Sequence, residues 1–170
     1  MARKKRPWRL GNKEKKPKDP RLWLYGRVPS GFWREIGNQR LYLEWLGEQL
    51  GFTKPEDWYQ LSYQDLEQRH GSRLLAKFNG SVAAMLRDYR PDYDWKEWLF
   101  LRSPKSFWKQ ADNRRRYLDW LGTQLGYQRP EDWAGLRQAD LFRHGGQRLL
   151  RKLHLQVSQI VDEYLGTQKR

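Results

Sequence analysis

The chain has 170 residues, enough for one domain or two small ones. Charged residues make up 32% of it and aromatic residues 15%, with ten Trp, so the composition predicts a packed core under a highly charged surface and excludes a largely disordered chain. The absence of cysteine excludes disulfides, thiolate metal sites and a Cys nucleophile.

No apolar run approaches the roughly 18–20 residues of a membrane span, and no signal-peptide pattern follows Met1. We therefore expect a soluble, intracellular protein that does not contact membranes. The sequence leaves open whether it works in the cytoplasm, a nucleus or nucleoid, an organelle or a virion.

The net charge of +14 is distributed unevenly. Residues 1–20 hold nine Lys/Arg and two Asp/Glu, residues 21–100 hold eleven of each kind, and residues 101–170 hold fourteen basic and seven acidic residues. A charge that served only solubility would be spread evenly. The pattern indicates that the N-terminus and the second half contact a polyanion.

Residues 1–21 are rich in Lys and Pro and show neither a helical nor a strand period. We interpret them as a basic extended arm that is disordered when free. Its candidate contacts to nucleic acid are Arg3, Lys4, Lys5, Arg6, Lys15 and Lys16.

From residue 22 the chain repeats itself with a shift of 75 positions. Tyr42–Gly51 reads YLEWLGEQLG and Tyr117–Gly126 reads YLDWLGTQLG, and 26 of the 59 positions in 32–90 are identical to those in 107–165. Self-similarity at a fixed period is typical of tandem repeats. We expect repeat 1 at residues 22–97, with no net charge, and a basic repeat 2 at residues 98–170.

Each repeat is expected to contain four helices. Asn38 or Asn113 is expected to cap the first helix, whose apolar stripe runs to about Gln49 or Gln124, and Gly51 or Gly126 to end it in a left-handed conformation.

The later helices of repeat 1 are expected to begin at Pro55, after Ser62 and after Ser81, and the one that begins after Ser62 is expected to break at Gly71 and resume at Arg73. In repeat 2, both capping serines are replaced, and a single helix across Leu149–Leu165 is expected. There is no strand pattern of consequence, so the predicted class is all-α, with two tandem repeats of about 75 residues.

The aligned pieces F-W…N-x-R-x-Y-L-[ED]-W-L-G-x-Q-L-G-[FY]-x-[KR]-P-E-D-W and D-L…G-x-R-L-L-x-K cover most of residues 22–165. They resemble a Trp-rich tandem helical repeat of algal, plant-organelle and large-DNA-virus proteins, a family with no established activity.

Asp65–Tyr89 is also similar to the homing-endonuclease-associated repeat, through its G-S-x-x-x-A-L-like pattern at Gly80-Ser81. This resemblance implies that the end of each repeat is helix-turn-helix-like and that the protein is a DNA-binding accessory module. Repeat 2 departs from the pattern at the turn, where His154-Leu155-Gln156 replace Asn79-Gly80-Ser81.

No catalytic or metal-binding constellation is visible. The three histidines (His70, His144 and His154) lack partners at metal-ligand spacing. The acidic pairs Glu56-Asp57 and Glu131-Asp132 follow a proline at a helix start, where carboxylates stabilise the positive helix end. We therefore expect no enzyme activity and no cofactor.

The recurring tryptophans are expected to lie in the core, because packing requires identical offsets and base stacking does not. They are Trp33, Trp45, Trp58, Trp108, Trp120 and Trp133.

The basic residues of repeat 2 are the candidate phosphate contacts. Arg114-Arg115-Arg116 are expected at the start of a helix, where cations oppose the helix dipole and phosphate would compensate them. Arg148, Arg151 and Lys152 are spaced to share one helix face, and Arg137 and Arg143 precede them. A solvated charged face remains the alternative interpretation.

These features favour a non-catalytic nucleic-acid-binding protein that contacts phosphate through repeat 2 and the arm, either as a DNA-binding accessory or as an RNA-binding component of a larger nucleoprotein assembly. The alternative is a protein–protein interaction module in which the aromatic first repeat docks a partner. The sequence does not decide between DNA and RNA.

Overall fold

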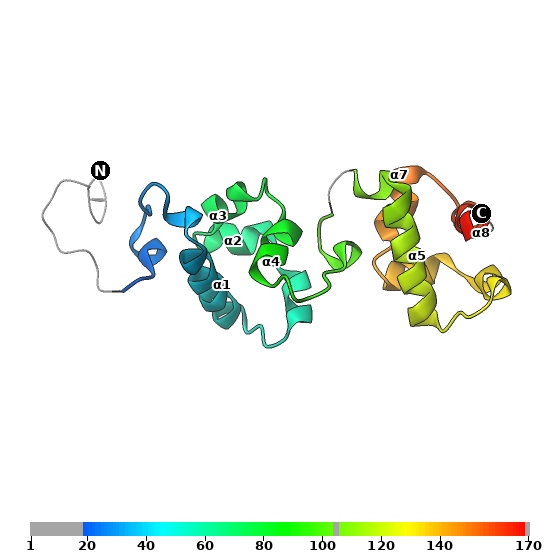
Figure 1. Ribbon diagram of the computed structural model, residues 1–170, viewed down its shortest axis with the longest axis horizontal. Coiled ribbons are helices and arrows are strands. Elements are labelled where there is room, and N and C mark those ends of the chain that lie inside the picture. The colour runs from blue at the N-terminus through cyan, green and yellow to red at the C-terminus, as the bar shows by residue number, and fades with distance from the viewer. Residues whose placement is uncertain (1–18, 104–105, 169–170) are drawn as a thin grey trace, which may run out of the picture. The chain divides into compact units, whose positions relative to one another are not determined.

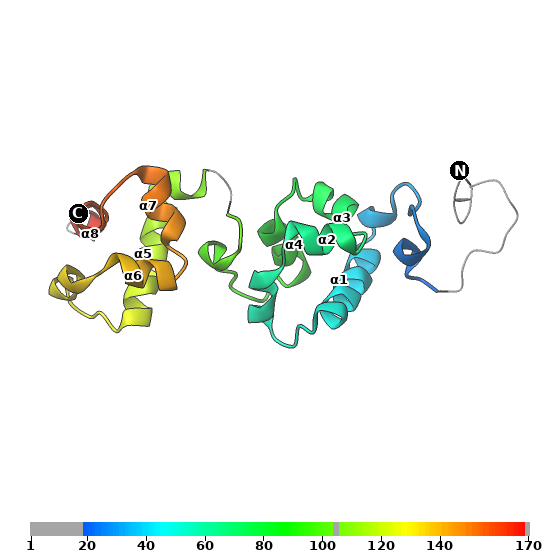
Figure 2. The ribbon, with the colours of Figure 1, turned by 180° about the vertical axis from the view of Figure 1, so that it is seen from behind.

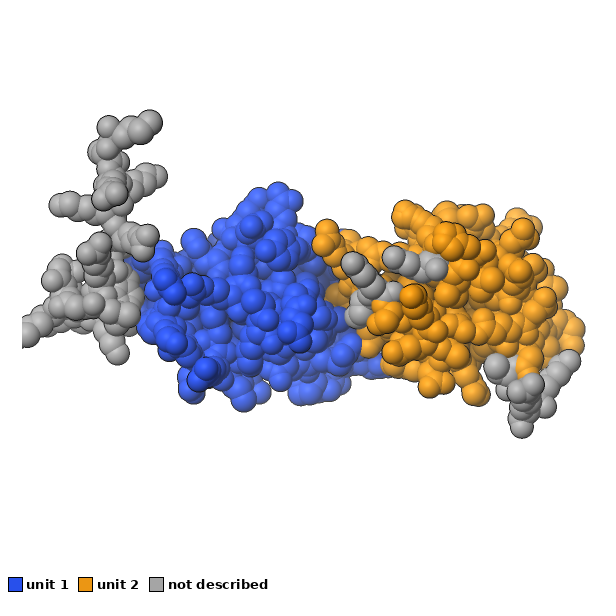
Figure 3. Space-filling model, turned by 90° about the horizontal axis from the view of Figure 1, so that it is seen from above, with its two compact units in different colours: residues 1–95 blue, residues 96–170 orange. Residues whose placement is uncertain are grey.

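The computed structural model describes residues 19–103 and 106–168 (Figure 1). The chain divides into two compact units, Met1–Trp95 and Lys96–Arg170, shown in separate colours in Figure 3. Every regular element in the described residues is a helix, which confirms the all-α class. None of the described helices has the length and apolar character that a membrane span requires.

Both units use the same succession of elements, in which short 3₁₀ helices (η) alternate with α-helices. In unit 1 these are η1 (Leu22–Tyr25), η2 (Phe32–Arg34), α1 (Ile36–Leu50), η3 (Pro55–Gln60), α2 (Tyr63–Gln68), α3 (Ser72–Lys77) and α4 (Val82–Tyr89). In unit 2 they are η4 (Glu97–Leu99), η5 (Phe107–Lys109), α5 (Ala111–Leu125), η6 (Pro130–Gly135), α6 (Gln138–Arg143), α7 (Gln147–Leu153) and α8 (Val157–Gln168).

The long helix of each unit ends as the sequence predicts. Gly51 has φ +69° and Gly126 has φ +72°, a left-handed conformation that glycine adopts without the strain a Cβ would bring. The amide of Phe52 donates to the carbonyl oxygen of Gly47 at 2.9 Å, and Tyr127 repeats the bond to Gly122 at 2.8 Å. The left-handed ending predicted for both helices is confirmed, and these hydrogen bonds are those of a Schellman motif.

The start of the long helix is not where the sequence places it. The helices begin at Ile36 and Ala111, so Asn38 and Asn113 lie inside the first turn rather than capping it. Their amides donate backwards, to the carbonyl oxygens of Phe32 at 2.9 Å and Phe107 at 3.0 Å. The prediction of an asparagine cap was wrong because this backward bond uses the same side chain for a different purpose.

The helices predicted to begin at Pro55, after Ser62 and after Ser81 begin there, and α3 begins at Ser72, one residue before the predicted Arg73. Ser62 accepts a hydrogen bond from the Asp65 amide at 3.0 Å, and Ser81 accepts one from the Ala84 amide at 3.1 Å. Pro55 and Pro130 lie in the first turn of 3₁₀ helices that include Trp58 and Trp133.

The single helix predicted across Leu149–Leu165 does not form. His154 has φ +54°, which ends α7 before α8 begins. Asn79 has φ +53° at the equivalent position of unit 1. A left-handed residue ends a right-handed helix whatever side chain it carries. The turn is therefore kept in unit 2 although its sequence has changed.

The core of each unit is a set of aromatic rings around one tyrosine. Trp23 and Trp33 meet Tyr42 edge to face, with centroids 5.3 Å apart in both pairs. Trp98 and Trp108 surround Tyr117 in the same way, at 5.4 and 5.2 Å. Edge-to-face pairs add stability beyond the area they bury.

Each of these two tyrosines packs against a glycine that lies between two later α-helices of its unit. The Tyr42 hydroxyl donates to the carbonyl oxygen of Arg69 at 3.0 Å, and a Cβ on Gly71 would lie 2.2 Å from its oxygen. Tyr117 stands in the same relation to Gly146, also at 2.2 Å. These contacts hold α1 against the turn between α2 and α3, and α5 against the turn between α6 and α7.

Most of the recurring tryptophans are core residues, as predicted: Trp33, Trp58, Trp108 and Trp133 are buried. Trp45 and Trp120 are only half-buried, at the edge of the aromatic set. Trp23 and Trp98, which the sequence leaves unassigned, are buried as well.

Candidate nucleic-acid interface

The candidate cations of unit 2 lie on three helices that pack together. In Figure 2, α6 and α7 lie in front of α5, on the side that is turned away in Figure 1, and α8 lies farther out. Arg114, Arg115 and Arg116 belong to α5, Arg143 to α6, and Arg148, Arg151 and Lys152 to α7. Arg137 directly precedes α6.

The Arg114 side chain makes its contacts within unit 2. Its Nη1 donates to the carbonyl oxygens of Trp108 and Lys109, both at 3.0 Å, and its Nη2 pairs with Glu163 on α8. Only 15% of the side chain is exposed. The expectation that Arg114 anchors phosphate is therefore corrected, because the protein's own acid and carbonyl groups occupy its guanidinium.

The equivalent residue of unit 1 shows what the side chain at this position does in the fold. The equivalent residue there is Gln39, which is buried and donates from Nε2 to the carbonyl oxygen of Trp33 at 2.8 Å. Arginine in unit 2 keeps that bond and adds the pair with Glu163. Both side chains fasten the long helix to the 3₁₀ helix before it.

Replacing Arg114 by glutamine should therefore keep the fold. The amide can make the bond that Gln39 makes, but Glu163 loses its partner, so we expect a loss of about 1–3 kcal/mol in the free energy of unfolding. Affinity for duplex DNA and its salt dependence should not change. Urea unfolding and a binding titration on the same samples measure both quantities, and an affinity loss in the folded variant would restore Arg114 as a contact.

Arg115 and Arg116 are exposed, and in the described residues neither makes a hydrogen bond or an ion pair. The argument from the helix dipole does not apply to them, because α5 begins at Ala111 and all three arginines lie beyond its first turn. Their availability rests instead on their exposure and on the lack of a partner within the described residues.

The cations of α6 and its N-terminal residue also face solvent. Arg137 is exposed, and its backbone amide donates to Asp140 Oδ2 at 3.0 Å. The Arg143 guanidinium is 4.0 Å from Asp140, with 76% of its side chain exposed, which is a weak surface pair. Both guanidinium groups can donate hydrogen bonds to a phosphate in place of water.

On α7 the three predicted residues have different environments. Arg148 is half-buried and donates from Nη2 to the carbonyl oxygen of Leu101, which leaves part of its guanidinium for a ligand. Arg151, one turn later, is exposed. The side chain of Lys152 lies outside the described residues, as do the arm residues Arg3, Lys4, Lys5, Arg6, Lys15 and Lys16.

The aspartate of each acidic pair has structural partners. The carboxylate of Asp132 accepts from the amides of Gln128 and Arg129, both at 2.9 Å, and these bonds lower its pKa. Asp57 accepts in the same way from Thr53 and Lys54, which lowers its pKa too. A carboxylate held as the anion by its helix start is a poor general acid or base near neutral pH.

The histidines are dispersed. His70 and His154 occupy left-handed turn positions, and His144 donates from Nδ1 to the carbonyl oxygen of Asp140, 2.7 Å away, while its ring contacts Trp120. Within residues 19–103 and 106–168, no group of three His, Asp or Glu side chains is placed to hold a metal ion.

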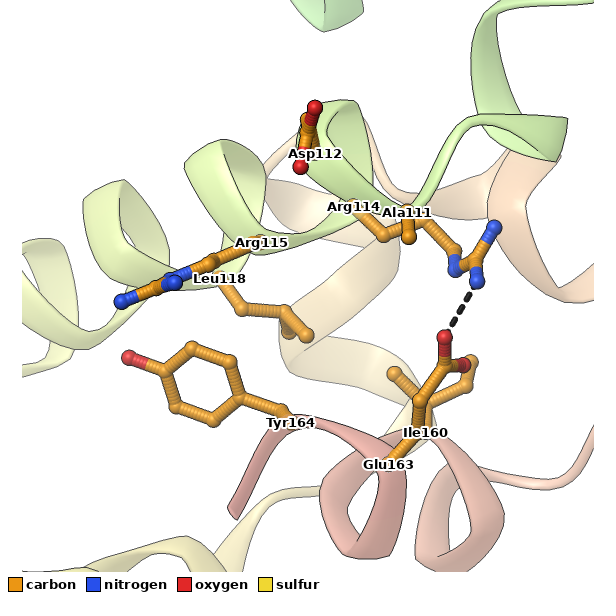
Figure 4. A pocket seen from close by; sticks show the side chains of 8 residues that line it. All are labelled: Ala111, Asp112, Arg114, Arg115, Leu118, Ile160, Glu163 and Tyr164. Carbon is orange, nitrogen blue, oxygen red and sulfur yellow. Dashed lines mark hydrogen bonds and ion pairs between the residues drawn. The ribbon is translucent and has the colours of Figure 1, made fainter. Parts of the chain in front are cut away.

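Unit 2 also contains a cavity of about 100 Å³ between α5 and α8, which sequence reasoning missed (Figure 4). Leu118, Ile160 and Tyr164 line it together with Arg114, Arg115 and Glu163. The only signal in the sequence is that Ala111 and Ile160 replace Ile36 and Met85 of unit 1, which has meaning only once the packing of the helices is known.

Comparison of the chain with protein-family models, curated proteins and solved structures gives no match.

Proposed function

We propose that this protein is a non-catalytic nucleic-acid-binding protein whose second unit holds the phosphate backbone. The observation that supports this proposal is the presence of exposed guanidinium groups on one unit that are not neutralised within the described residues: Arg115, Arg116, Arg137 and Arg151, with Arg143 only weakly paired. We call these five residues the arginine set.

The comparison of the units supports the same proposal. Four of the five equivalent residues in unit 1 are uncharged: Leu41, Ser62, Gln68 and Ala76 correspond to Arg116, Arg137, Arg143 and Arg151. A fold that is stable with uncharged residues at these positions does not need the arginines for packing. Exposed, unpaired cations that the fold does not need are available for a polyanion.

The mode of binding that we propose is contact with the backbone rather than reading of bases by a helix. In a helix-turn-helix-like end, α8 would be the helix that enters a groove. Its sequence, Val157–Gln168, contains Asp162 and Glu163 and no Lys or Arg. An acidic helix repels phosphate, so α5, α6 and α7 are proposed to carry the contact, with the arm adding cations from residues 1–21.

Salt titration tests the proposal. The arginine set together with the arm supplies six or more possible phosphate contacts, for which affinity should fall by about 10³–10⁵-fold between about 50 mM and 200 mM salt. Fluorescence anisotropy with labelled DNA and RNA measures the slope. Binding that is absent or indifferent to salt would refute the proposal, whereas a protein partner retained in high salt after nuclease treatment would favour the interaction-module alternative.

A further inference from the structure

The cavity between α5 and α8 has a mixed chemical lining. Its floor is apolar, formed by Leu118 and Ile160, which are 2% and 1% exposed. Figure 4 shows the Arg115 side chain and the Tyr164 ring on one side and the Arg114–Glu163 pair on the other. Such a site suits a flat ring that carries polar substituents and lies next to an anionic group.

The size of the cavity limits the ring. An engineered apolar cavity of about 150 Å³ in another protein accommodates benzene. At about 100 Å³ this cavity admits one six-membered ring in part, and the ring's substituents can extend past Ala111 and Arg115, both exposed at the mouth. A fused two-ring system is too large to enter to the same depth.

The lining also contains a buried donor without a partner. Arg114 Nε is buried and makes no hydrogen bond within the described residues, although both terminal nitrogens of the same guanidinium are bonded. A buried N–H without an acceptor is unfavourable, and a carbonyl oxygen on a bound ring would satisfy it. Asp112 and Glu163 supply carboxylate oxygens that can accept from a ring N–H or amino group.

Arg115 belongs to the arginine set and also lines the cavity, so it connects the proposed phosphate contacts with the cavity. A nucleotide could therefore place its phosphate on Arg115 and its base in the cavity. Bases in a duplex are stacked and paired, so only an unpaired base can enter.

We propose that this cavity binds one unpaired pyrimidine base of a single-stranded nucleic acid, while Arg115 contacts its phosphate. The proposal rests on the nucleic-acid-binding function proposed above and specifies its ligand. Unit 1 differs at the mouth, where Ile36 takes the place of Ala111, so the base site is assigned to unit 2 alone.

The test compares two probes that carry the same phosphates. An oligothymidylate of about eight nucleotides is matched with an abasic strand of equal length, and binding of the full chain to each is measured at one low salt concentration. We expect the oligothymidylate to bind about tenfold tighter, the size of one stacked base.

Two variants place the same side chain at different sites of unit 2. Ala111→Phe covers the cavity mouth and should reduce oligothymidylate affinity to the abasic level without changing abasic affinity. Ala134→Phe adds an exposed phenyl group on η6, which contributes no residue to the cavity lining, and should change neither. Thermal unfolding verifies that both variants are folded. A titration of the wild-type chain with thymidine 5′-monophosphate, followed at the Ile160 methyl resonances, gives a readout that needs no variant.

The outcomes separate the two proposals. Equal affinity of the wild-type chain for both probes would overturn the base site and leave phosphate binding intact. A preference that persists in folded Ala111→Phe, or Ile160 signals that do not respond to the nucleotide, would also overturn the base site. If neither probe binds at low salt, the nucleic-acid function itself fails.

Discussion

Replacement of Gly146 by alanine is expected to lower the free energy of unfolding by more than about 3 kcal/mol, at the upper end of the cost of overpacking a core. The new Cβ would lie 2.2 Å from the Tyr117 hydroxyl oxygen and 2.8 Å from its Cζ, and this tyrosine is fully buried among Trp98 and Trp108. Alanine tolerates the backbone angles of Gly146, φ −81° and ψ 2°, so the cost is steric. Urea unfolding measures it.

The control is Gly135→Ala, where no heavy atom beyond the adjoining residues lies within 4 Å of the new Cβ and the stability should change by no more than about 0.5 kcal/mol. The Tyr117→Phe background removes the nearest clashing atom, so Gly146→Ala should cost less there, by about 1 kcal/mol or more. Equal costs in the two backgrounds would show that the tyrosine does not set the requirement for glycine.

This packing could not be predicted from the sequence, although both residues could be identified as recurring. Tyr42 and Tyr117 lie in the repeated decapeptide, and Gly71 and Gly146 recur with the same shift of 75 positions. Recurrence shows that a position matters to the repeat but not what it touches. The contact joins residues that are 29 positions apart, and only the path of the chain brings them together.

Local signals were reliable where one residue decides the backbone. The left-handed ends at Gly51 and Gly126 and the caps at Ser62 and Ser81 follow from the preferences of single residues, and the structure confirms them. The turn at His154 shows the limit of this reasoning. Its sequence lacks the capping residues of unit 1 and favours a continuous helix, yet the chain makes the same left-handed turn that Asn79 makes in unit 1.

The candidate interface shows a second limit. Arg114, Arg115 and Arg116 are chemically identical in the sequence, yet Arg114 points to Glu163 and two carbonyl oxygens whereas its neighbours are exposed. Neighbouring residues on a helix are turned by about 100° from one another, so a run of three cations cannot lie on one face. Which of the three is internal depends on where the helix begins, and the sequence places that start three residues too late.

The largest effect on binding is expected when four members of the arginine set are replaced together. Changing Arg116, Arg137, Arg143 and Arg151 to glutamine removes four exposed cations without removing a hydrogen bond made by their side chains within the described residues. Each lost phosphate contact lowers the salt slope by about 0.7–0.9, so we expect the slope to fall by about 3 and the affinity near 100 mM salt to fall by about 10²–10³-fold.

The matched control removes the same number of charges from unit 1, with glutamine at the exposed residues Arg27, Arg34, Arg40 and Arg73. Both variants have the same net charge, so any difference between them reports where the charges lie and not how many there are. The unit 1 variant should lose less than about tenfold in affinity and keep its salt slope within about one unit, because long-range attraction is screened beyond roughly 10 Å at this salt concentration. Equal losses in the two variants would mean that nucleic acid responds only to total charge. In that case the arginine set would not be the surface that binds nucleic acid.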